Sequence, residues 1–109
     1  MIHELKTIPN YFNDVLSGEK SFEVRKADRP FHKDDLLALN EFNPETRSYT
    51  GRSCLVQIDY ILNDPEYVKK DYVILGIKPC CVSLVNDRIF ANGNVYKVPL
   101  ATEGDNGRA

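Results

Sequence analysis

Residues 18–25, which read Gly-Glu-Lys-Ser-Phe-Glu-Val-Arg, mark the end of a predicted helix and the start of a predicted strand. Gly18 stands where a helix should end, because glycine readily adopts the left-handed conformation of a C-terminal cap. In the strand predicted next, Phe22 and Val24 point to one face, and Glu23 and Arg25 point to the other. We therefore expect the apolar pair to anchor the strand in a core, with the charged pair on the opposite face.

The rest of the chain has the pattern of short strands with one helix. The helix is predicted over 9–17, because proline suits a first helical turn and apolar residues recur at helical spacing. Strands are predicted over 3–6, 20–25, 36–42, 53–62 and 71–78, with a turn at 43–47. A hairpin is predicted where the apolar runs 89–91 and 95–98 flank an Asn-Gly-Asn turn. These elements predict a mainly β (α+β) fold, a small open β-barrel with the helix at one end.

Two of these strands carry more detailed expectations. The run 36–42 is dense in apolar residues, so its first half should be buried on both faces. In the run 53–62, alternate residues share one face. Those residues are Cys54, Val56, Ile58, Tyr60 and Leu62. We expect this face to be the buried one, with Cys54 as a small core residue rather than a nucleophile.

The composition bounds the class of protein. A chain of 109 residues suits one domain, and its 28% charged and 42% hydrophobic residues are ordinary for a globular protein. The net charge of -2 provides no overall basic field, so any binding of nucleic acid should be local. No apolar run approaches the ~20 residues of a membrane span, and the first residues lack signal-peptide features. These patterns predict a cytoplasmic protein.

The cysteines and histidines do not have the spacing of a metal site. Cys80 and Cys81 are adjacent, which is poor geometry for a disulfide between them, and Cys54 leaves an odd number. His3 and His32 show no zinc-binding spacing with these cysteines. We expect reduced thiols, no metal and no cofactor.

Lys20, Glu23 and Arg25 are the candidate ligand-binding residues. The guanidinium of Arg25 suits a phosphate or a base edge, and the carboxylate of Glu23 can accept a hydrogen bond from an exocyclic amine. Lys20 adds a mobile positive charge, so the three together would fit a nucleotide. The alternative is a solvent-exposed Glu23–Arg25 ion pair, which contributes only about 0–1 kcal/mol. Spacing alone favours that alternative.

A positive rim is predicted around these residues. From 20 to 33 the chain carries five lysines or arginines against two acidic residues, although the whole chain is negative. Lys6 and Arg29 are the main rim candidates, with Lys26, His32 and Lys33 as further members. The excess is compatible with phosphate contacts, and equally with a solvated loop. Tyrosines 49, 60, 67 and 72 are available for stacking, but each is expected in the core or rim.

Part of the chain resembles a known family. The resemblance rests on Pro9, Tyr11, Phe12, Val15, Gly18, Lys20, Glu23, Val24, Arg25, Asp28, Arg29 and 31–36. In this pattern the chain is similar to the activating-signal-cointegrator homology (ASCH) domain, in particular to a bacterial and phage branch of unknown function. The similarity runs from about His3 through Lys78. Residues 1–78 are thus predicted to form the barrel, 79–101 a C-terminal extension with the hairpin, and 102–109 a disordered tail.

The resemblance implies a fold and a ligand. ASCH domains belong to the PUA-like β-barrels, which are thought to bind RNA or a modified nucleoside in a cleft beside the helix. The resemblance places Lys20, Glu23 and Arg25 in that cleft. One branch of the family looks enzymatic and removes the acetyl group from acetylated cytidine, with a threonine nucleophile three residues after the lysine. Glu23 occupies that position here, so the same reaction is not expected by default.

Two alternative functions stay open. The first is an amidohydrolase that acts on a modified nucleoside through a rearranged site. There Glu23 would activate a water, and Lys20 or Arg25 would stabilise an oxyanion. The second is a protein-interaction or homo-oligomer contact made by the C-terminal hairpin through an exposed strand edge. Its contacts would be Phe90, Val95, Tyr96 and Val98.

Overall fold

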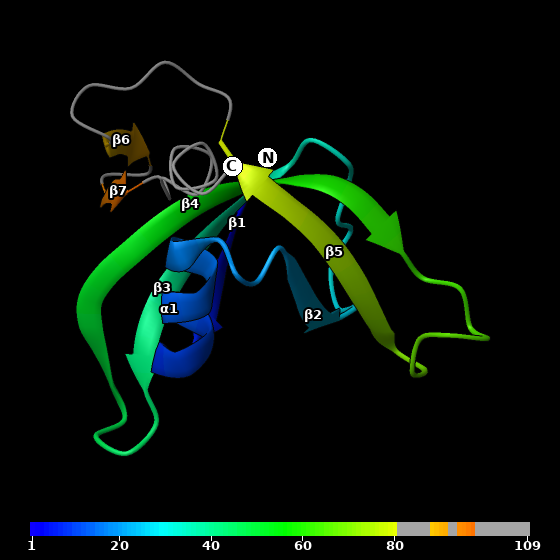
Figure 1. Ribbon diagram of the computed structural model, residues 1–109, viewed down its shortest axis with the longest axis horizontal. Helices are drawn as coiled ribbons and strands as arrows, with labels where there is room; N and C mark the ends of the chain where they lie inside the picture. Colours follow the sequence, from blue (N-terminus) through cyan, green and yellow to red (C-terminus); the bar gives the residue numbers. More distant parts are fainter. Residues whose placement is uncertain (81–87, 92–93, 98–109) are drawn as a thin grey trace.

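The described part of the chain is mainly β with one short helix, as predicted (Figure 1). The computed structural model describes residues 1–80, 88–91 and 94–97. Its elements are β1 (Ile2–Thr7), α1 (Pro9–Ser17), β2 (Phe22–Lys26), β3 (Leu36–Asn43), β4 (Ser48–Leu62), β5 (Tyr72–Pro79), β6 (Arg88–Ala91) and β7 (Asn94–Lys97). No helix among the described residues has the length and apolar character to cross a membrane.

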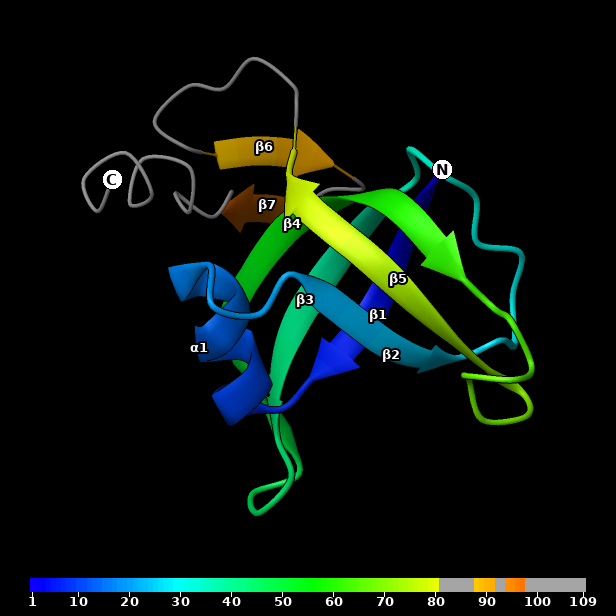
Figure 2. The ribbon, with the colours of Figure 1, turned by 45° about the vertical axis from the view of Figure 1, so that its right-hand side comes forward.

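The strands form one curled sheet that does not close on itself. Along the main path the order is β1-β3-β4-β5-β2, so β1 and β2 are its two edges. The β1–β3 pair is parallel, and the other pairs along this path are antiparallel. Figures 1 and 2 show the sheet curling round, with α1 beside β3. We call the line along which β1 and β2 face each other the seam.

The C-terminal strands extend this sheet. β6 and β7 pair in antiparallel fashion, and β7 makes a parallel pairing with β4 at Cys54 and Lys97. The side-chain contacts predicted for the hairpin lie outside the described part of the structure. Those contacts are Phe90, Val95, Tyr96 and Val98. The predicted disordered tail at 102–109 also lies outside it.

The helix has the predicted bounds, and local chemistry explains both ends. Pro9 occupies the first turn, where its missing N–H costs no hydrogen bond. Gly18 has a φ of 86°, and its N–H donates to the carbonyl of Val15 at 3.1 Å. The next contact fixes the path into β2, because the N–H of Lys20 donates to the carbonyl of Asp14 at 3.0 Å. The backbone at Lys20 is therefore fixed by a hydrogen bond to the helix that precedes it.

The core lies inside the curl of the sheet. Its buried members are Leu5, Phe12, Val15, Leu37, Leu39, Cys54, Val56, Ile58, Val73, Leu75 and Ile77. On the outer side, Ala38 packs with Leu55 and Cys80. The start of β3 is thus buried on both faces, as predicted.

The predicted faces of β4 are wrong beyond Ile58. The register with β5 shifts between Ile58 and Tyr60, which makes Asp59 an extra residue on β4. This bulge turns Tyr60 out to solvent, and Ile61 packs against the core instead. Gly76 lies opposite the bulge, where an added Cβ would lie 2.6 Å from the Asp59 carboxylate and 3.2 Å from Cβ of Tyr60. β4 also begins at Ser48 rather than Ser53, because its pairing with β3 continues to the turn.

The predicted faces of β2 are reversed. Phe22 and Val24 are 44% and 50% exposed, whereas Glu23 is 2% exposed. The apolar pair therefore does not anchor the strand in the core. An isolated buried carboxylate would be costly, so this orientation requires cations beside Glu23. Those cations are part of the site described next.

Candidate functional site

Glu23 is the centre of a buried charge cluster on β2. The Lys20 ammonium donates to Oε2 of Glu23 at 2.6 Å. Arg25 donates to Oε1 through Nε at 3.0 Å and through Nη2 at 2.8 Å. Two cations thus meet one carboxylate, and their side chains are 15% and 22% exposed for Lys20 and Arg25. The cluster has a surplus of one positive charge.

Thr7 connects this cluster to the opposite edge of the sheet. Nη2 of Arg25 donates to Oγ1 of Thr7 at 3.1 Å, so a side-chain bond crosses the seam from β2 to β1. Thr7 is buried, and its hydroxyl carries a proton of its own. Nothing in the local sequence around residues 18–25 signals Thr7, because the two strands meet only in the folded sheet.

A first hollow lies directly over the charge cluster. It has a volume of about 400 Å³. We call it the smaller hollow, and its lining residues are Lys6, Thr7, Ile8, Tyr11, Lys20, Phe22, Glu23, Val24 and Arg25. The Lys20 ammonium lies 5.1 Å from the ring centroids of both Tyr11 and Phe22. Because aromatic side chains stand exposed beside buried charges, this hollow has the features of a ligand site.

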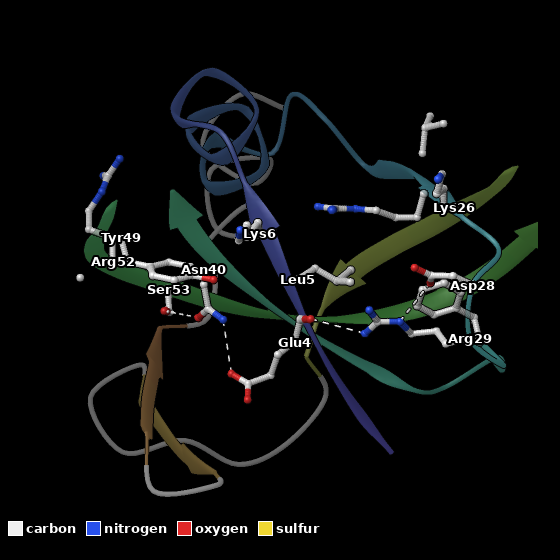
Figure 3. A pocket seen from close by; sticks show the side chains of 14 residues that line it. Glu4, Leu5, Lys6, Lys26, Asp28, Arg29, Asn40, Tyr49, Arg52 and Ser53 are labelled. Carbon is white, nitrogen blue, oxygen red and sulfur yellow. Dashed lines mark hydrogen bonds and ion pairs between the residues drawn. The ribbon is translucent and has the colours of Figure 1, made fainter. Parts of the chain in front are cut away.

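A second hollow lies further along the seam (Figure 3). It has a volume of about 1020 Å³, and we call it the larger hollow. Its lining residues are Glu4, Leu5, Lys6, Val24, Arg25, Lys26, Asp28, Arg29, Phe31, Asn40, Tyr49, Gly51, Arg52 and Ser53. Lys6, Val24 and Arg25 border both hollows. In Figure 3, Lys6 lies between the side of Tyr49 and Arg52 and the side of Lys26 and Arg29.

A second buried carboxylate, Glu41, is bonded to Arg52, which lines the larger hollow. Glu41 on β3 accepts from Nε and Nη2 of Arg52 at 2.8 Å each, and from the Thr50 hydroxyl at 2.6 Å. Nη2 of Arg52 also donates to Asn13 on α1 at 2.7 Å, and the guanidinium lies over the ring of Phe12. The hydrogen bonds from Arg52 hold the pKa of Glu41 below its usual value, although burial opposes this shift.

The structure brings the three central candidates together, and it places the rim candidates Lys6, Lys26 and Arg29, but not His32 and Lys33, in the lining of the larger hollow. Lys20, Glu23 and Arg25 are in direct contact, so the alternative of a solvent-exposed Glu23–Arg25 pair is wrong. Lys6 lines both hollows, and Arg29 lines the larger one. His32 is absent from the lining of both hollows, and its backbone N–H donates to Asp35 at 3.0 Å.

The sequence pattern does not assign three of the lining residues to the site. Tyr11 carries part of the family resemblance, and more than half of it is exposed in the lining of the smaller hollow. Tyr49 is expected in the core or rim and lies exposed in the lining of the larger hollow, and no sequence signal points to Arg52 beside it. Cys54 is a fully buried core residue, as expected, and burial raises the pKa of its thiol to about 12.

Comparison with known proteins places the chain in a family. Residues 2–77 match the family described as Domain of unknown function (DUF3850). The chain is also 36% identical, over 97 residues, to the uncharacterized 12.9 kDa protein in the GpA 3' region of Escherichia phage P2. That alignment covers 84% of this chain and 86% of the phage protein. Both hollows are lined by residues within the matched range, so they belong to the part that the family shares. This chain therefore belongs to the DUF3850 family.

Proposed function

We propose that this protein is a cytoplasmic RNA- or nucleotide-binding domain of the ASCH type, with its ligand in the smaller hollow. The observation that carries the proposal is a buried carboxylate, bonded to two cations, beneath exposed aromatic side chains. The resemblance of residues 18–29 to ASCH domains supports it further. So does the position of the smaller hollow beside α1, where that resemblance places the ligand cleft.

The lining residues suit the parts of a nucleotide. Tyr11 and Phe22 offer exposed rings for stacking on a base. A carboxylate provides about four acceptor positions, and the bonds from Lys20 and Arg25 occupy three of those on Glu23. The remaining one can accept from an exocyclic amine, as carboxylates do from cytosine. The surplus positive charge of the cluster favours a phosphate group nearby.

An amidohydrolase that acts on a modified nucleoside is the second candidate. Thr7 favours it, because its hydroxyl lines the smaller hollow beside Arg25, which would stabilise an oxyanion. A hydroxyl is thus present in the hollow although position 23 lacks one. We favour binding, because the Lys20 ammonium donates to Glu23, while the hydroxyl of Thr7 accepts from Arg25 and so has another cation, not a base, as its bonded partner.

A matched pair of variants tests the proposal. Glu23→Gln and Glu41→Gln each remove one buried charge that is bonded to an arginine, but only Glu23 lines the smaller hollow. Binding to nucleosides, nucleotides and short RNAs, including acetylated cytidine, would be measured by calorimetry. We expect the wild type and Glu41→Gln to bind, and Glu23→Gln to lose about tenfold or more in affinity.

The other outcomes are equally decisive. If the folded wild type binds nothing in this panel, or if both variants bind as the wild type does, the proposal is wrong. Released acetate and cytidine would be followed in the same samples. Turnover that disappears in Glu23→Gln and in Thr7→Val would replace the binding proposal by the amidohydrolase.

A further inference from the structure

The larger hollow extends the smaller one along the seam. Lys6, Val24 and Arg25 belong to the lining of both, so a ligand that fills the smaller hollow lies next to the larger one. The larger hollow has more than twice the volume of the smaller, at about 1020 Å³ against 400 Å³. A single nucleotide in the smaller hollow would leave this second space unfilled.

Tyr49 provides an exposed aromatic surface in the larger hollow. It is 56% exposed, and its ring packs edge to face with Phe42, with 5.1 Å between centroids. The Lys6 ammonium lies 4.5 Å from the centroid of Phe42. The ring of Tyr49 is thus held in place by its neighbours and still available to a ligand. Stacking on such a ring is tolerant of base identity, because every base has an aromatic face.

Cationic side chains outnumber acidic ones in the lining of the larger hollow. Lys6, Arg25, Lys26, Arg29 and Arg52 line the larger hollow, against two acidic residues, Glu4 and Asp28. Three of these cations have carboxylate partners, in the pairs Arg25–Glu23, Arg29–Asp28 and Arg52–Glu41. Within the described part of the chain, Lys6 and Lys26 form no ion pair. These two lysines are therefore available to phosphates.

We infer that the larger hollow is a second nucleotide subsite and that the ligand is a single-stranded nucleic acid. A base stacks on Tyr49, and Lys6, which borders both hollows, holds the phosphate that connects it to the base over Glu23. Lys26 and Arg29 hold a further phosphate of the strand. A single strand is required, because bases inside a duplex are stacked on one another and cannot enter separate hollows. This inference rests on the proposed function of the smaller hollow.

A length series of oligonucleotides tests the second subsite. Fluorescence anisotropy would compare a labelled mononucleotide, dinucleotide, tetranucleotide and octanucleotide, each as RNA and as DNA of the same sequence. We expect affinity to rise at least tenfold from the mononucleotide to the tetranucleotide, and to fall with added salt. A preference for RNA at equal length would show that the sugar is read, and equal binding would show that phosphate and base suffice.

Tyr49→Ala and Tyr67→Ala form the matched pair for this experiment. Both tyrosines are exposed, at 56% and 75%, but Tyr67 lines neither hollow. Tyr49→Ala should lower tetranucleotide affinity about tenfold and leave mononucleotide affinity unchanged, whereas Tyr67→Ala should change neither. The double variant Lys26→Gln, Arg29→Gln should reduce the salt dependence for the tetranucleotide alone.

The failure of this inference can be told apart from the failure of the proposed function. If the mononucleotide binds and affinity does not increase with length, or Tyr49→Ala has no effect, the second subsite is wrong and the smaller hollow stands. If octaglutamate displaces the tetranucleotide at equal concentration, the larger hollow is an acidic-peptide site instead. If neither mononucleotide nor oligonucleotide binds, the proposed function itself fails.

Discussion

Glu23 and Glu41 are two buried carboxylates with the same kind of partner and different surroundings. Both are almost fully buried and bonded to an arginine. Glu41 has one cation, Arg52, which also bonds to Asn13 of α1 and lies over the ring of Phe12. Glu23 has two cations and a hollow above them. The Glu41–Arg52 pair therefore has no net charge, whereas the Glu23 cluster has a net charge of one positive unit.

This difference shows which feature points to a site. A buried ion pair alone is common in structural networks and holds elements in register. The Glu41 pair does this, since Arg52 connects β4 with α1. The Glu23 cluster differs in its surplus cation and in the apolar side chains that stand exposed around it. Those two properties, rather than the burial of a carboxylate, favour the smaller hollow as the ligand site.

The largest expected effect concerns the free energy of unfolding. Glu23→Ala leaves two cations facing one another, and the loss of one member of a buried pair typically costs about 3–5 kcal/mol. Glu41→Ala should cost less, about 1–3 kcal/mol, because the side chain of Arg52 is 51% exposed and can turn to water. Urea unfolding at neutral pH measures both. Equal losses would mean that the two clusters are equally structural.

The next effect concerns ligand affinity. Arg25→Ala removes a charge-assisted donor from the smaller hollow, and we expect mononucleotide binding to weaken by about 1.5–3 kcal/mol. Arg52→Ala removes the matching arginine of the Glu41 pair and should leave mononucleotide binding unchanged. Calorimetry on both variants measures this, after circular dichroism has verified that each is folded. An unchanged affinity in Arg25→Ala would remove the smaller hollow as the binding site.

A smaller effect concerns the pH dependence of stability. Arg52 lowers the pKa of Glu41 in the folded state from its ordinary value of 4.5. The unfolded chain therefore binds the proton more readily, and the stabilisation is fully present above about pH 4.5 and lost as pH falls through the lowered pKa. Glu41→Gln should be less stable than the wild type at neutral pH, with a gap that narrows in acid. If the difference in stability between the wild type and Glu41→Gln stays constant down to strongly acid pH, the Glu41–Arg52 ion pair does not stabilise the fold.

The smallest effect concerns two glycines, one before each cluster. Gly18 precedes Lys20 with a φ of 86°, and Gly51 precedes Arg52 with a φ of 94°. Each lies in the left-handed region, where a side chain costs about 1 kcal/mol. Gly18→Ala and Gly51→Ala should therefore each lose about that much unfolding free energy. A loss only at Gly18 would show that the backbone near Arg52 relaxes.

Sequence reasoning worked where the decisive chemistry is local. The bounds of α1 follow from Pro9 and Gly18, which act on their own turns of the chain. The turn at 43–47 follows from Asn43, whose side-chain oxygen accepts from the N–H of Glu45. The motif residues Lys20, Glu23 and Arg25 are close in sequence and so were bound to be neighbours. No long-range information was required for any of these.

Sequence reasoning failed where contacts between distant elements decide which face of a strand is buried. The alternation in β2 defines two faces, but the choice of the inner face depends on the cations that neutralise Glu23 and on the seam beside it. The bulge at Asp59 lies opposite Gly76 in the paired strand, although a glycine inside a strand is a usable signal for one. Tyr49 and Arg52 join the site only because β4 curls round to the larger hollow.

The seam also has a mechanical consequence. In a closed barrel, a ladder of main-chain bonds between first and last strands sets the circumference. Here two side-chain bonds span the described edges: Arg25 to Thr7 at 3.1 Å, and Arg29 to the carbonyl of Glu4 at 3.4 Å. No described strand pair depends on these two bonds, since β1 pairs with β3 and β2 pairs with β5. The width of the opening between the two edges is thus set by arginine side chains rather than by main-chain bonds.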